Sequence, residues 1–312
     1  MGWRKLFTRM VTLPFTTAEA IMTIGGQAVV EGVMMKSPRH LATAVRKPNG
    51  TIKVKHRKEQ FLTQRTFLGK VPFVRGMIVL FETMIKGMRE LNWSANEAID
   101  EEEEKLNAWE LGLMMALSIA LALALFKFLP LLLASWITKD VGNNWTFNLL
   151  DGGIKFSFFL LYLLAISRMK DVKRLFQYHG AEHKSVNCYE ARRALTPRNA
   201  KKFTKRQARC GTTFVVYVIV LSILVYLFIP FGATFWEKYV LRIALLPVIA
   251  GIAYEWTRFA GKYYCKSAFL RFISAPGMAV QALTTREPDL KQLEVAIAAL
   301  KRVLKEERVL KE

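Results

Sequence analysis

Long apolar stretches alternate with basic ones along the chain. Four stretches are apolar enough to cross a bilayer: residues 111–137, 147–166, 211–230 and 239–256. A helix needs about 20 mostly apolar residues to span the hydrocarbon core. Because backbone polar groups in hydrocarbon must pair within their own segment, the pattern predicts four membrane-spanning helices. We therefore expect a mainly α, polytopic membrane protein.

Strand patterns are confined to the part of the chain before the first span. Residues 42–57 form two alternating runs around Asn49-Gly50, and this pair predicts the tight turn of a β-hairpin. Ahead of it, residues 24–35 read IGGQAVVEGVMM, which predicts a single strand entered and left through glycines. The same glycines would also let the backbone approach a ligand closely. Together these segments predict a small N-terminal β-containing module.

Two further segments predict amphipathic helices. Residues 71–91 place four charged side chains at helical spacing among apolar ones, which favours an interfacial helix over a fifth span. Across residues 290–304, apolar positions recur every three or four residues after Asp289, a good N-cap. We expect this C-terminal helix to dock on the N-terminal module or on another subunit.

Charge then orients the spans. The 312 residues are 52% hydrophobic and carry 46 basic against 25 acidic side chains, a net charge of +21. This combination excludes intrinsic disorder and an ordinary soluble fold. Basic residues gather before the first span, in the loop 167–210 and after the fourth span, whereas each of the other two connections holds one Lys. Because Lys and Arg remain on the cytoplasmic side, both termini and that loop are predicted to be cytoplasmic.

The predicted organisation therefore has three parts. Residues 1–109 form the cytoplasmic module, residues 110–256 the four-span membrane domain with its basic loop, and residues 257–312 a cytoplasmic tail with the amphipathic helix. Lys127 lies inside the first span, where a charge at the bilayer centre costs about 3 kcal/mol. We favour snorkelling of this lysine to the outer interface. The alternative is pairing with Asp151 or Glu255 inside the bundle.

One motif carries recognisable chemistry. His179 and His183 stand at positions i and i+4 of a predicted helix, so both imidazoles can converge on one metal ion, most simply zinc. Glu182 completes the pattern H-x-x-E-H, an inverted form of the zinc-protease signature. In such a site the metal activates a water and the carboxylate of Glu182 takes its proton.

A metal centre needs at least one more protein ligand. Glu255, at the cytoplasmic end of the fourth span, is the leading candidate, because an acid there is expensive unless it is paired. The alternatives that remain open are Glu190, Cys188 and Cys210. The three cysteines show no C-x-x-C spacing, so the sequence supports neither a disulfide framework nor a cysteine-only zinc finger. The other two histidines are predicted to be surface positions; they are His40 and His56.

Five strings give the chain a family resemblance: IGGQAVVEGVMMKSP, RGMIVLFETMIKGM, YHGAEHKSVNCYE, RCGTTFVV and PGMAVQALTTREPD. In this order they resemble the bacterial YqhQ-like family of membrane proteins, often labelled predicted metal-dependent enzymes. The resemblance covers roughly residues 21–300 and implies a bacterial cytoplasmic membrane location and metal at His179 and His183. It also ties together polar residues within these strings, which either line one cleft against the inner leaflet or are scattered caps and turns: Gln27, Glu31, Arg209, Gln281, Thr284, Thr285 and Arg286.

Two functions of different classes follow. The first is a metal-dependent hydrolase acting at the inner leaflet on a peptide or a lipid. The second is a non-catalytic assembly or scaffold protein whose basic face binds anionic lipid or the ribosome, through the cluster Lys201-Lys202, Lys205-Arg206 and Arg209. Contacts with other membrane proteins and oligomer formation fit either function, and no sequence-specific DNA binding is expected. A transporter is third, since the spans show little from which to build a midplane site.

Overall fold

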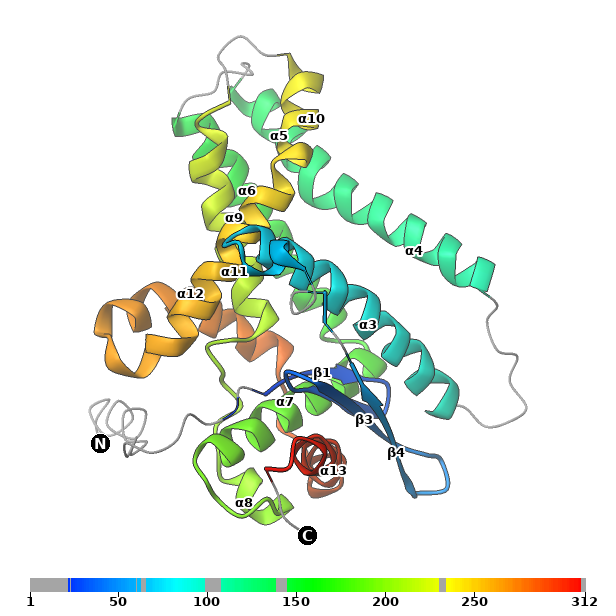
Figure 1. Ribbon diagram of the computed structural model, residues 1–312. Coiled ribbons are helices and arrows are strands. Elements are labelled where there is room, and N and C mark those ends of the chain that lie inside the picture. The colour runs from blue at the N-terminus through cyan, green and yellow to red at the C-terminus, as the bar shows by residue number, and fades with distance from the viewer. Residues whose placement is uncertain are drawn as a thin grey trace, which may run out of the picture.

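The computed structural model describes residues 22, 24–59, 61–62, 66–98, 108–138, 145–229 and 234–309. It shows a mainly helical protein with a small N-terminal antiparallel sheet, which confirms the predicted fold class at this level. The apolar helices gather at one end of the molecule, and the sheet lies at the other end between helices (Figure 1).

Four strands form the sheet in the order in which they occur along the chain. They are β1 (Gly25–Val29), β2 (Gly32–Lys36), β3 (His40–Arg46) and β4 (Ile52–Lys58). The predicted hairpin is confirmed as β3 and β4, paired in register from Arg46 opposite Ile52 to His40 opposite Lys58. Its turn passes through Gly50, whose φ of +85° lies in the left-handed region that favours glycine.

The prediction of a single strand over residues 24–35 is wrong. This segment is a second hairpin, formed by β1 and β2, and the chain reverses at Glu31 with a φ of +51°. Such a φ is uncommon for a residue other than glycine. The turn also lacks an Asn-Gly pair like the one that predicted the β3–β4 turn, so the sequence carried no signal for it. Gly32 instead permits close packing, because a Cβ there would lie 2.2 Å from the carbonyl oxygen of Ala44.

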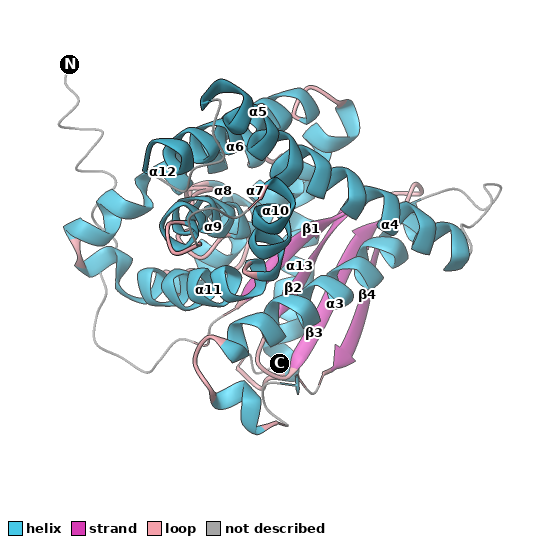
Figure 2. Ribbon diagram, turned by 90° about the horizontal axis from the view of Figure 1, so that it is seen from above, coloured by secondary structure: helices cyan, strands magenta, loops and turns pink. Residues whose placement is uncertain are grey.

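Helices cover both faces of the sheet. α7 (Lys170–Glu190) and α13 (Leu290–Glu306) pack on one face, and α3 (Val74–Ala98) packs on the other; Figure 2 shows α3 running across the strands. Because side chains alternate across a strand, Ala42 joins the core beneath α13, while Leu41 joins the one beneath α3. The predicted docking of the C-terminal helix on the N-terminal module is therefore confirmed.

α13 begins with the predicted cap. The carboxylate of Asp289 accepts a hydrogen bond from the backbone N–H of Gln292 (2.7 Å), and the side chain of Gln292 accepts one from the backbone N–H of Asp289 (3.0 Å). Asp289→Ala is expected to cost about 1 kcal/mol of stability. Thermal unfolding of the purified protein in detergent, followed by circular dichroism, measures this loss. Lys301→Ala, an exposed change within the same helix, is the control, and equal midpoints for the two variants would contradict the role of the cap.

The other helices build the apolar end and its connections. In chain order they are η1 (Phe67–Lys70), α4 (Ala108–Leu123), η2 (Ala124–Phe128), α5 (Leu129–Thr138), α6 (Trp145–Ile166), α8 (Pro197–Lys201), α9 (Gly211–Tyr226), α10 (Phe235–Ala244), α11 (Leu246–Tyr263), η3 (Tyr264–Lys266) and α12 (Ala268–Thr284). α12 lies in the region predicted as a tail, yet it packs against α9.

Two helices of the described chain are long and apolar enough to cross a membrane, over Gly112–Thr138 and Trp145–Ile166. A third span results if α10 and the helix after it count as one, but they meet at a bend of 41°. Pro247 explains the bend, because it has no backbone N–H to continue the hydrogen-bond ladder from α10. α9 has only 16 residues. The prediction of four spans is thus supported for two or three helices.

Charged side chains meet inside the apolar bundle. Asp151 of α6 pairs with Lys155, one turn away, and with Arg242 of α10, whose Nη1 lies 2.6 Å from Asp151 Oδ2. Lys127 lies in η2, a π-helical turn, and donates a hydrogen bond to the hydroxyl of Tyr226 (2.9 Å). Lys127 therefore points into the bundle and not toward an outer interface, and its hydrogen-bond partner is Tyr226 and not Asp151 or Glu255. The spans hold more buried charge than the sequence analysis assumed.

Candidate metal centre

α7 brings the histidine motif to the layer between the sheet and the bundle. His179 and His183 lie one turn apart on this continuous helix, and their ring centroids are 4.4 Å apart. The predicted convergence of the two imidazoles is therefore present in the structure. His183 is 1% exposed, whereas His179 is half-buried.

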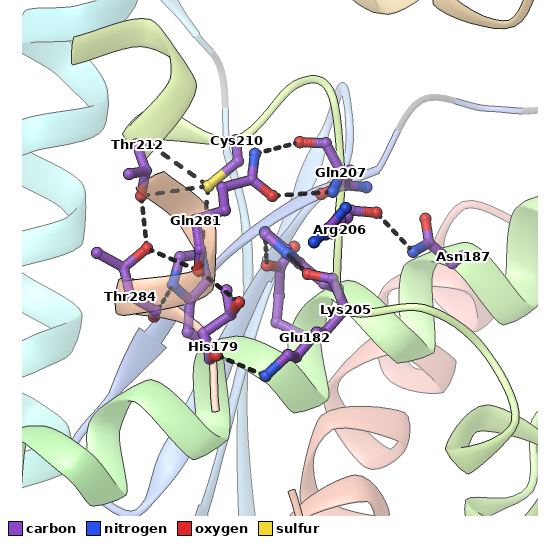
Figure 3. Close-up of polar contacts among 12 residues, drawn as sticks. His179, Glu182, Asn187, Lys205, Arg206, Gln207, Cys210, Thr212, Gln281 and Thr284 are labelled. Carbon is purple, nitrogen blue, oxygen red and sulfur yellow. Dashed lines mark hydrogen bonds and ion pairs between the residues drawn. The ribbon is translucent and has the colours of Figure 1, made fainter. Parts of the chain in front are cut away.

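Cys210 is the residue that joins the two histidines. It is the N-cap of α9, and its Sγ lies 3.4 Å from His179 Nε2 (Figure 3). One ligand atom from each of His179, His183 and Cys210 lies within 4.8 Å of the other two. The third member of the group thus comes from the loop before α9.

The other candidate ligands have different partners. Glu255, the leading candidate from the sequence, forms a two-pronged ion pair with Arg75 of α3, with Arg75 Nε 2.6 Å from Glu255 Oε1. The carboxylate of Glu255, which lies within α11 (Leu246–Tyr263), is therefore paired, but with an arginine. Glu190 pairs with Arg209. Cys188 is packed in the hydrophobic core beneath α13.

Backbone carbonyls fix the orientation of both imidazoles. His179 Nδ1 lies 2.9 Å from the carbonyl oxygen of Thr284, and His183 Nδ1 lies 2.6 Å from that of Lys205. A carbonyl oxygen only accepts hydrogen bonds, so each Nδ1 must carry a proton, and in the neutral imidazole the lone pair is then on Nε2. Histidines that ligate metals are oriented by the same kind of second hydrogen bond.

The carboxyl group of Glu182 faces one of these Nε2 atoms, that of His183. Glu182 is 2% exposed, and its Oε2 lies 3.3 Å from His183 Nε2. Because both atoms are acceptors, a proton or a metal cation must lie between them. Burial raises the pKa of the Glu182 carboxyl to about 7, which is the usual value for a group that exchanges protons near neutrality.

Two glycines allow the close packing around the motif. A Cβ on Gly26 of β1 would lie 2.6 Å from Glu182 Cγ, and a Cβ on Gly180 would lie 2.0 Å from the carbonyl oxygen of Arg286. Gly26 therefore makes room for the buried carboxylate, and Gly180 lets the chain after α12 pass close to α7. The glycine pair in the sequence suggested a close approach, but nothing in it indicated which side chain approaches.

Only part of the predicted cleft assembles around the histidines. Gln281 and Thr284 of α12 belong to it: Gln281 Nε2 donates to the carbonyl of Gln207 (2.7 Å), and Thr284 Oγ1 lies 3.0 Å from Thr212 Oγ1 (Figure 3). Thr285 contributes its carbonyl to Lys205 Nζ (2.9 Å).

The remaining predicted cleft residues have partners elsewhere or at its edge. Glu31 pairs with Arg174 nearer the start of α7, and Gln27 lies against Gly87 of α3. Arg286 donates to the carbonyl of Ser167 (3.3 Å). Arg209 reaches Glu190, near the end of α7. Sequence reasoning missed Thr212, whose backbone N–H donates to Cys210 Sγ (3.4 Å); the only local signal was its place in the first turn of an apolar helix.

These features define a class: a helical protein with two or three membrane-length helices and a small β-module, between which lies a His-His-Cys group. Comparison with known proteins specifies the family. A model of the family described as protein of unknown function, DUF1385, matches residues 71–306. The chain is also 32% identical over 294 residues to the uncharacterized protein YqhQ of Bacillus subtilis (strain 168), covering 90% of this chain and 92% of that protein.

The chain therefore belongs to the DUF1385 family, and the YqhQ-like resemblance is confirmed. No solved structure matches it.

Proposed function

We propose that this protein is a metal-dependent hydrolase of the bacterial cytoplasmic membrane, acting at the inner leaflet on a peptide or lipid. His179, His183 and Cys210 would hold the ion, and Glu182 would act as general base. The observation that carries the proposal is the convergence of His179, His183 and Cys210, with both Nδ1 atoms hydrogen-bonded to backbone carbonyls and His179 Nε2 facing the sulfur.

The donor set fits a divalent metal of intermediate softness, such as zinc. Imidazole nitrogen and thiolate sulfur are common zinc ligands, and three protein ligands leave one position open, as in catalytic zinc sites. Glu182 is not one of the three residues of the group, and its Oε2 lies 3.3 Å from His183 Nε2; we assign it the role of base. His179, His183 and Cys210 would hold zinc, which would supply Lewis-acid activation of water, and Glu182 would accept the proton.

The surroundings support a reaction at a membrane surface. The loop that supplies Cys210 leads directly into the apolar helix α9, and Thr284, which orients His179, ends α12. The centre therefore lies where the sheet module meets the apolar bundle. A substrate held at the inner leaflet would reach it without leaving the membrane surface.

Metal analysis tests the ligand set. The detergent-purified protein is expected to lose one metal ion per chain in each of His179→Ala, His183→Ala and Cys210→Ser. Cys265→Ser, which changes an exposed cysteine, is the matched control and should retain the wild-type content. Inductively coupled plasma mass spectrometry gives the stoichiometry. Identical metal content in the wild type and the three ligand variants would refute the centre.

A non-catalytic scaffold is the second candidate, favoured by three exposed cations that end or follow α8: Lys201, Lys202 and Arg206. Such a surface attracts anionic lipid or RNA phosphates. Replacing these three residues with Glu should then abolish co-purification with anionic lipid or ribosomes. If that loss abolishes function while the metal-ligand variants remain functional, the scaffold role is favoured over the hydrolase.

A further inference from the structure

A second pair of histidines faces the C-terminal helix. In the β3–β4 hairpin, His40 lies opposite Lys58 and His56 lies opposite Ala42. His40 and His56 are therefore diagonal neighbours on the same face of the sheet as Ala42. This is the face that α13 covers. The prediction that both are surface positions is wrong for His40, which is 8% exposed.

The two imidazoles and a carboxylate form a compact group. His40 Nδ1 lies 2.9 Å from His56 Nε2, and the two rings are stacked with centroids 5.1 Å apart. Glu306, the last residue of α13, has its Oε1 3.8 Å from His56 Nδ1. One ligand atom from each of the three residues lies within 4.8 Å of the other two.

The spacing of the nitrogens suits a shared ion. Metal–nitrogen bonds of about 2.0–2.1 Å place two neighbouring ligand nitrogens roughly 3 Å apart. The nitrogens of His40 and His56 already have this separation. Binding requires that the proton between them leaves and that the Glu306 carboxylate rotates away from Arg302, whose Nη2 lies 2.8 Å from Glu306 Oε1.

The end of α13 is held firmly beside the histidines. Glu307 accepts hydrogen bonds from Ser37 Oγ (2.9 Å) and from the backbone N–H of Arg39 (2.9 Å), and it forms a two-pronged ion pair with the Arg39 side chain. These contacts fix the β2–β3 turn to the helix terminus and so position Glu306 relative to His40. A helix C-terminus also carries partial negative charge, which favours a bound cation.

A cavity opens next to the group. It has a volume of about 550 Å³ and is lined by Arg39, His40, Lys58, Glu306 and Arg308. Arg39 is neutralised by Glu307, which leaves Lys58 and Arg308 as cations facing the space. They would repel a bare cation but would attract an anion that shares the coordination shell.

We propose that His40, His56 and Glu306 form a second divalent-metal site, separate from the centre on α7, with its open positions facing this cavity. Two histidines and one carboxylate are a recurrent donor set for zinc and for iron(II), and they leave positions free for water or a small anion. The site would join both strands of the hairpin to the C-terminal helix, and it does not depend on the proposed hydrolase.

Zinc titration of the chelator-stripped full-length protein in detergent tests the proposal. The wild type should bind two ions per chain, and His40→Ala and His56→Ala should each bind one. In these two variants the zinc affinity of the His40–His56–Glu306 site should fall by about 100-fold or more. Replacing even a residue that only hydrogen-bonds to a metal ligand lowers metal affinity about 10–100-fold. Lys58→Ala, which alters the cavity but not the ligands, should still bind two. Glu306→Gln, which keeps the side-chain volume, should weaken the same site without unfolding the protein.

The two sites give separable outcomes. Cys210→Ser should remove only the ion of the centre on α7, so this variant should still bind one ion. The double variant Cys210→Ser, His56→Ala should bind none. If the α7 centre fails but this site is real, the wild type binds one ion and His56→Ala binds none. A wild-type zinc stoichiometry that His40→Ala and His56→Ala both leave unchanged, in variants with wild-type unfolding midpoints, overturns the proposal.

Discussion

Glu182→Gln is expected to keep the metal content of the wild type and to slow hydrolysis by about 10²–10⁴-fold, the usual contribution of a general base. Glutamine preserves the size of the buried side chain, so the room left by Gly26 remains filled. It cannot accept a proton from water, however. The variant thus distinguishes a role of Glu182 in catalysis from a role in metal binding.

The measurement uses the purified protein in vesicles of phosphatidylglycerol and phosphatidylethanolamine, with a mixture of fluorogenic peptides added outside. Mass spectrometry of the lipid and peptide products shows which class is cleaved. Glu190→Gln is the control, because Glu190 pairs with Arg209 and is not a member of the metal group. Wild-type rates in a metal-loaded Glu182→Gln protein would show that this carboxylate is not the base.

The largest loss of stability is expected for Asp151→Asn. Asp151 is 1% exposed and is the carboxylate that faces both Lys155 and Arg242 in the apolar bundle. Removing one partner of a buried ion pair leaves the other charge uncompensated and costs about 3–5 kcal/mol. Asparagine has the same shape as aspartate, so this cost arises from charge and not from a cavity.

Thermal unfolding in detergent measures the effect against Asp171→Asn, which removes an exposed carboxylate in the first turn of α7. We expect a clear drop in the unfolding midpoint for Asp151→Asn and little change for Asp171→Asn. A second change that removes the excess cation, Lys155→Met, should restore part of the lost stability. If Asp151→Asn and Asp171→Asn unfold at the same temperature, the buried network contributes nothing to folding.

Local patterns predicted those parts of the fold that depend on neighbours in the chain. Asn49-Gly50 specifies the β3–β4 turn, and the spacing of His179 and His183 places both rings together on α7. Capping by Asp289 likewise depends on residues within one turn. In each case the geometry follows from backbone preferences that act over a few residues.

Contacts between segments distant in the sequence determine the partners of the candidate ligands, which the sequence patterns did not predict. Cys210 was one of three alternatives to Glu255, and it joins the histidines because the loop before α9 passes over α7. Glu255 is paired with Arg75 because α3 packs against α11. The turn at Glu31 and the bend between α10 and α11 were also missed. Packing selects a strained φ in the first case, whereas in the second the local break at Pro247 bends a stretch whose hydrophobicity alone predicts one straight span.

The position of α13 has a consequence for biosynthesis. The strands are synthesised before the helix that covers their apolar face, and helices α3 to α12 lie between them in the sequence. Until α13 is synthesised, Val33, Met35 and Ala42 lack the helix that covers them, while the long apolar helices of the chain have already been made. Such exposed strands invite aggregation and chaperone capture. A stop codon shortly before Leu290 should therefore leave the N-terminal module exposed to proteolysis, even though every residue of the sheet is present.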